Sequence, residues 1–151
     1  MQAMNSLRIF GFLVAAGLVP AALAQSGPPP GECPQPRFTG KAPDDFYNRK
    51  NPVVPGAESN AAAEKIFRGA DGAASCAACH GRKGDGKGKL ADQFTPRPRN
   101  FACSKTIEGV PDGQLFWIVR FGSPDTAMPP HPQLSDTEVW QVVNYLRTLA
   151  K

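Results

Sequence analysis

The chain has 151 residues, among them 16 prolines, 15 glycines and four cysteines, and its formal net charge is +4. No nucleic-acid-binding motif accompanies the basic residues, so composition and charge exclude nucleic acid as an expected partner. The length is enough for one small domain and a targeting segment.

The first 24 residues have the pattern of a secretory signal peptide. Arg8 supplies a basic region, residues 9–23 are almost wholly apolar, and Ala22-Leu23-Ala24 matches the small-x-small pattern cut by signal peptidase. The apolar run is shorter than a membrane-spanning helix requires; an uncleaved anchor helix is the alternative. We therefore expect cleavage after residue 24 and a periplasmic protein that does not span the membrane.

Residues 25–59 form a Pro-rich extension. Its prolines predict extended or polyproline-like chain rather than a helix of useful length. Phe38, Phe46 and Tyr47 are apolar and favour partial packing of the extension onto the domain, whereas a disordered leader is the alternative. The domain itself is predicted to span residues 60–151.

Two helices are predicted in the first part of this domain. Asn60 is a favourable cap for a short helix over residues 61–69, and Asp112 for a helix over residues 113–121. Gly122 then fits the left-handed position that commonly ends a helix.

The last predicted helix has the clearest signals. Ser135 and Glu138 form a capping box, and apolar residues follow at helical spacing as far as Leu149. No segment shows the alternation of a β-strand, so we expect an all-α domain with loops between its helices.

The segment Cys76-Ala77-Ala78-Cys79-His80 is the c-type haem attachment motif. Two thiols three residues apart on a helical turn are placed to add to the two vinyl groups of one haem, and the next residue presents an imidazole to the iron. The attached porphyrin would supplement a thin hydrophobic core. The alternatives are a redox-active disulfide, which usually follows a strand, and half of a zinc site, whose other ligands would be oddly spaced.

From about residue 60 to residue 151 the chain resembles a class I cytochrome c of the bacterial periplasmic monohaem type. The resemblance rests on the attachment motif, Phe67 in the preceding helix, a methionine in a Pro-containing loop, and Trp140 and Tyr145 in the last helix. It implies a cytochrome c fold wrapped around one covalently attached haem c, and electron transfer between redox partner proteins. One departure is Ala63, where family members often carry glycine at a helix crossing.

The resemblance implies His80 and Met128 as the axial ligands of the haem iron. Met128 is the one methionine after the predicted cleavage site, and it lies among prolines and polar residues, where a core-filling methionine is not expected. Its thioether would raise the reduction potential relative to two imidazoles. His131, the other histidine, is the rival ligand. With both axial positions filled no open coordination site remains, so we expect no enzymatic activity.

The Nδ1–H of His80 is expected to donate to a backbone carbonyl, which fixes the imidazole ring. The resemblance points to Pro96 or Pro98 as the acceptor.

Cys33 and Cys103 remain once the haem takes the other two cysteines. An even cysteine count in an oxidising compartment favours a disulfide between them, which would tie the Pro-rich extension to the loop beneath the haem. Two free thiols, or a bridge to a partner protein, are the alternatives.

Basic residues are concentrated between positions 82 and 105. They are predicted to ring the exposed haem edge and to steer an acidic redox partner, although solvated basic loops are the alternative. The basic residues are Arg82, Lys83, Lys87, Lys89, Arg97, Arg99 and Lys105, against Asp85 and Asp92.

The leading interpretation of the chain's function is a diffusible electron carrier. The alternatives are a cytochrome subunit of a larger dehydrogenase, oxidase or reductase complex, and a catalytic or gas-sensing haem protein.

Overall fold

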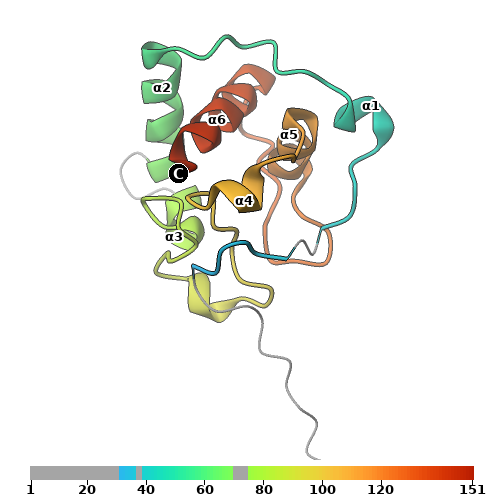
Figure 1. The fold of residues 1–151 in the computed structure, drawn as a ribbon. Helices are drawn as coiled ribbons and strands as arrows, with labels where there is room; N and C mark the ends of the chain where they lie inside the picture. The colour runs from blue at the N-terminus through green and yellow to red at the C-terminus, as the bar shows by residue number, and fades with distance from the viewer. Residues whose placement is uncertain (1–30, 37–38, 70–74) are drawn as a thin grey trace, which may run out of the picture.

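The computed structural model describes residues 31–36, 39–69 and 75–151; the predicted signal peptide, the start of the extension and Phe38 lie outside these ranges. Within them the chain contains helices and loops but no strand, which confirms the all-α prediction (Figure 1). None of these helices is long and apolar enough to cross a membrane. The elements are α1 (Asp44–Tyr47), α2 (Ala57–Arg68), α3 (Cys76–His80), η1 (Ala91–Gln93, a 3-10 helix), α4 (Ser104–Ile107), α5 (Asp112–Phe121) and α6 (Asp136–Leu149).

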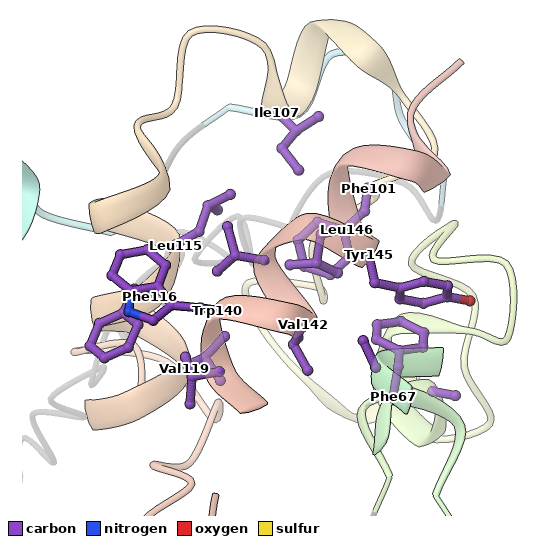
Figure 2. Packing of buried hydrophobic residues seen from close by; sticks show 14 residues of the cluster. Phe67, Phe101, Ile107, Leu115, Phe116, Val119, Trp140, Val142, Tyr145 and Leu146 are labelled. Carbon is purple, nitrogen blue, oxygen red and sulfur yellow. The ribbon is translucent and has the colours of Figure 1, made fainter. Parts of the chain in front are cut away.

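The hydrophobic core lies where α6 packs against α2 on one side and α5 on the other (Figures 1 and 2). Towards α2, the rings of Phe67 and Tyr145 are 5.5 Å apart between centroids, and Ala63 is fully buried. Towards α5, the rings of Phe116 and Trp140 stack with their centroids 4.2 Å apart. Paired aromatic rings therefore fix α6 to both neighbours.

The start of α2 differs from the sequence prediction. The helix begins at Ala57 with Gly56 in the N-cap position, so Asn60 lies inside it and not at its end. The four residues before position 61 contain no proline, and Glu58 is an acidic residue in the first turn, which favours a helix N-terminus. The helix therefore continues four residues further towards the N-terminus than its cap signal predicted.

The ends of the two later helices follow their local signals closely. The capping box of Ser135 and Glu138 is complete, and Gly122 follows α5 at a φ of 82°. Asp112 is the first residue of α5 and not its cap. Its carboxylate accepts from the guanidinium of Arg147 instead, at 2.7 and 3.1 Å from the two donor nitrogens, and so ties α5 to α6.

The described part of the Pro-rich extension packs onto the domain. In Figure 1 the extension passes below α4, forms α1 beside α5, and then crosses the top of the view to α2. Phe46 contacts the rings of Phe116 and Phe121, with centroids 6.4 and 5.2 Å apart. Further along, the side-chain amide of Asn51 donates to Asn144 on α6 at 2.8 Å. The expectation of partial packing is confirmed for these residues.

Candidate haem site

The attachment motif forms α3, a single helical turn. The hydroxyl of Ser75 caps it by accepting from the backbone N–H of Ala78 at 3.2 Å. The chain then folds back beneath the turn, where the N–H of Gly88 donates to the carbonyl of Cys79 at 3.1 Å. A Cβ at position 88 would lie 2.2 Å from the oxygen of Ala78, so this close return needs glycine. The return loop therefore holds the motif at a fixed place in the fold.

A cavity of about 300 Å³ opens beside this turn. The structure brings Cys76, Cys79, His80, Met128 and His131 together on its wall, although nearly 50 residues separate the motif from the methionine loop in the sequence. The rest of the lining is mainly apolar and includes Leu90, Phe94, Phe101, Ile107, Leu115 and Val119.

Cys76 and Cys79 are both partly buried. Burial raises the pKa of each thiol above the ordinary value of a cysteine. Zinc is not favoured at this site, because Cys33 and Cys103 are bonded to each other and the described residues contain no group of three acidic, histidine or cysteine side chains placed to hold a metal ion.

His80 is buried, with 8% of its surface exposed, and its ring stacks on Phe101 at 4.7 Å between centroids. Its Nδ1 lies 3.0 Å from the carbonyl oxygen of Arg99. A carbonyl only accepts, so Nδ1 carries the proton and Nε2 keeps its lone pair for a metal. Burial lowers the pKa of His80, and the hydrogen bond to Arg99 opposes this shift only in part. The imidazole is therefore neutral at neutral pH, as iron ligation requires.

The prediction that Pro96 or Pro98 accepts from His80 is wrong. The acceptor is the carbonyl of Arg99, one residue after Pro98. The carbonyl of Pro98 accepts instead from the side-chain amide of Gln35, at 3.2 Å. This contact comes from the extension, 63 residues away in sequence, and no local pattern signals it.

The loop that carries Met128 is held by short-range hydrogen bonds. The N–H of Ser123 donates to the carbonyl of Met128, and the N–H of Met128 donates to the hydroxyl of Thr126, both at 3.2 Å. A Cβ on Gly122 would lie 2.9 Å from that same carbonyl oxygen, so the loop closes tightly against the end of α5. The main chain of this loop is therefore well defined on the cavity wall.

His131 lies on the same wall and is half-buried rather than exposed. Its backbone N–H donates to the carbonyl of Val119 at 3.2 Å, and its Nδ1 is 3.2 Å from the side-chain amide of Gln133. Burial lowers the pKa of this second imidazole as well. Both candidates for the second ligand, Met128 and His131, thus line the cavity with His80, and substitution of each is needed to tell which one binds.

The disulfide between Cys33 and Cys103 ties the extension to the chain just before α4, with a Cα–Cα distance of 5.6 Å. Cys103 is buried and Cys33 is exposed. The extension is therefore linked covalently to a segment that borders the cavity, two residues after Phe101.

The basic residues after the motif differ in their surroundings. Arg97 forms an ion pair with Asp92, and the guanidinium of Arg99 donates to the carbonyl of Pro36 at 3.0 Å. Of the basic residues predicted to ring the haem edge, Arg99 is the one that lines the cavity. The remaining basic residues of this set are exposed to solvent; they are Arg82, Lys83, Lys87, Lys89 and Lys105.

Two adjacent thiols, a neutral imidazole and a thioether around one apolar cavity in an all-α domain define the class of c-type haem proteins. The comparison with protein families agrees, because the cytochrome c family model matches residues 61–150. The chain therefore belongs to the cytochrome c family. This family carries haem c bound covalently, and Cys76 and Cys79 with His80 supply its attachment motif.

The solved structures to which the chain is similar include two that carry a description of their protein. A component of the reducing HAO-like protein complex of Kuenenia stuttgartiensis shares 26% sequence identity and a TM-score of 0.57, over 66% of this chain and 47% of that one. This chain thus spans about half the length of that relative. The c-type cytochrome NirC shares 24% identity over 62% of this chain and 94% of its own, with a TM-score of 0.43. No curated protein matches the chain.

Proposed function

We propose that this chain is a periplasmic monohaem cytochrome that passes single electrons between redox partners, with His80 and Met128 as the axial ligands of its iron. The observation that supports this best is the meeting of the attachment motif and the sole methionine of the predicted mature chain on one apolar cavity. When bound, the haem supplies a one-electron Fe(II)/Fe(III) couple. Export follows from the signal pattern, and a disulfide suits an oxidising compartment.

The residues of the site have separate tasks in this proposal. Thioether bonds from Cys76 and Cys79 prevent dissociation of the cofactor. His80 provides a neutral imidazole, and Met128 provides a soft sulfur donor that favours Fe(II). Apolar side chains around the cavity exclude water and disfavour the extra charge of Fe(III), so they raise the reduction potential in the same direction as the methionine.

The sixth ligand is tested by absorption spectra of the purified oxidised holoprotein and two variants. A sulfur-to-iron charge-transfer band in the far red is expected for the wild type and for His131→Ala, and it should be absent from Met128→Ala. The two variants are matched, because both residues line the same cavity wall. A wild-type spectrum that lacks the far-red band, stays the same in Met128→Ala and changes in His131→Ala would make His131 the ligand.

A second candidate function is that of a fixed cytochrome subunit in a larger redox complex. It is favoured by the likeness to a component of a reducing HAO-like complex, the structure with the higher TM-score of the two above. Gentle purification from the native host distinguishes the two. A diffusible carrier elutes alone and exchanges electrons in solution, whereas a subunit is recovered with a second protein in fixed stoichiometry.

A further inference from the structure

The peptide group between Arg99 and Asn100 is held at both ends by side chains from distant parts of the chain. Its carbonyl, on Arg99, lies 3.0 Å from Nδ1 of His80. Its N–H, on Asn100, donates to Oε1 of Gln35 at 2.6 Å. One continuous line of hydrogen bonds therefore runs from Gln35 through a single peptide unit to the imidazole of the attachment motif.

Gln35 is itself firmly fixed. Only 8% of its surface is exposed, its side-chain amide donates to the carbonyl of Pro98 at 3.2 Å, and its backbone N–H donates to the hydroxyl of Thr106 at 3.1 Å. The Arg99 guanidinium donates back to the carbonyl of Gln35 at 3.3 Å. Both polar ends of the Gln35 side chain thus bind the loop, one on each side of the Arg99 carbonyl.

The neighbouring residues keep this segment in place. The side-chain amide of Asn100 donates to the carbonyls of Gly31 and Glu32 at 3.1 and 3.2 Å. Two residues before Gln35, the disulfide from Cys33 ties the chain to position 103. Position 35 also lies outside the 61–150 range that matches the cytochrome c family, so this contact is supplied by the extension of this chain.

A hydrogen bond to the N–H of a peptide makes its carbonyl a stronger acceptor, because bonds in a chain polarise one another. A stronger acceptor on Nδ1–H in turn makes an imidazole a more basic metal ligand and fixes its ring orientation. A more basic ligand stabilises Fe(III) over Fe(II) and lowers the reduction potential. The arrangement at Arg99 therefore transmits an effect from Gln35 to whatever metal His80 binds.

We propose that Gln35 is a positioning residue that orients and polarises the Arg99–Asn100 peptide, and thereby lowers the reduction potential of the iron bound by His80. The proposal rests on the function proposed above, because it requires an iron ligated by His80. The extension is accordingly part of the redox site and not only a structural strap.

The test is a spectroelectrochemical titration of the holoprotein and of Gln35→Met, which keeps the length of the side chain but neither accepts nor donates here. Loss of the bond should shift the Fe(III)/Fe(II) equilibrium about twofold to fivefold towards Fe(II), a rise of about 20–40 mV at 59 mV per tenfold. Gln93→Met is the matched control, since Gln93 is exposed on η1, and it should keep the wild-type potential. An unchanged potential in Gln35→Met would overturn the proposal.

A second measurement separates an electronic effect from loss of stability. In the reduced protein, NMR should show faster solvent exchange of the His80 Nδ1 proton in Gln35→Met than in the wild type and Gln93→Met. If Gln35→Met fails to take up haem, amide exchange in the wild-type protein still tests the proposal. Its Asn100 amide should be strongly protected from exchange, and rapid exchange would overturn the proposal.

The two proposals fail differently. A wild-type protein without a far-red band or a reversible one-electron couple contradicts the proposed function, whatever Gln35 does. A wild-type protein with both features, and a potential that does not respond to Gln35→Met, contradicts only the role of Gln35.

Discussion

Gly113, in the first turn of α5, lies directly against the backbone carbonyl of Phe46 at the end of α1. A Cβ at position 113 would be 2.0 Å from that oxygen. We expect Gly113→Ala to push the extension away and lower the free energy of unfolding by about 1–3 kcal/mol, measured by urea denaturation. Gly40→Ala is the control, because a Cβ there meets no atom within 4 Å. An equal loss of unfolding free energy in Gly113→Ala and Gly40→Ala would show that the close contact between Gly113 and Phe46 does not contribute to stability.

The disulfide from Cys33 to Cys103 closes a loop with a sequence separation of 70 residues. In the chain-entropy account, replacing both cysteines by serine should lower the free energy of unfolding by up to about 4 kcal/mol. Added reductant should destabilise the wild type by a similar amount and leave the double variant unchanged. If reductant has the same effect on both proteins, the loss comes from elsewhere in the molecule.

The capping box at the start of α6 predicts a stability effect that depends on pH. Glu138 accepts from the backbone N–H and the hydroxyl of Ser135 at 2.7 and 2.8 Å, and these bonds lower the pKa of its carboxyl below the ordinary 4.5. Because the folded pKa is the lower one, the contribution is complete above the unfolded value and disappears as the pH falls through the folded value.

Ser135→Ala should therefore cost about 1 kcal/mol of unfolding free energy at neutral pH. The advantage of the wild type over Glu138→Gln should shrink when the urea titrations are repeated in acid. A difference between those two proteins that stays constant from neutral to acid pH would contradict the assignment.

Exposed basic residues after the motif predict a salt-dependent reaction with anionic oxidants. We expect Lys83→Glu/Lys89→Glu to slow oxidation of the reduced protein by ferricyanide about threefold to tenfold at low ionic strength, as weaker electrostatic steering requires. Stopped-flow absorption measures this rate. Lys50→Glu/Lys65→Glu makes the same charge change on other exposed segments and should have a smaller effect. Equal slowing by both pairs would mean that net charge, and not a local face, is responsible.

The sequence predicted those features whose signals are local. The attachment motif, the capping box at Ser135 and the apolar spacing that follows it all act within a few residues, and each is found in the fold. The start of α2 was misplaced because Asn60 offers a good cap in isolation, while the residues before it continue the helix equally well.

The contacts around His80 were beyond prediction for a different reason. The carbonyl that accepts from its ring belongs to Arg99, 19 residues away, and the side chain that holds that peptide belongs to Gln35, 65 residues from Asn100. Such pairs depend on how loops meet in three dimensions. Every residue has a backbone carbonyl, so no residue type marks the one that accepts from His80. The packing of the extension was predicted from its apolar residues such as Phe46, but its partners on α5 and α6 are equally distant in sequence and were not.

The central claim is that Cys76 and Cys79 carry a covalently bound haem, and a denaturing mass measurement on the purified mature protein tests it most directly. The account predicts the polypeptide beginning at Gln25 plus one haem, and the polypeptide alone for Cys76→Ser/Cys79→Ser. A wild-type mass without haem, with both thiols open to alkylation, would contradict it.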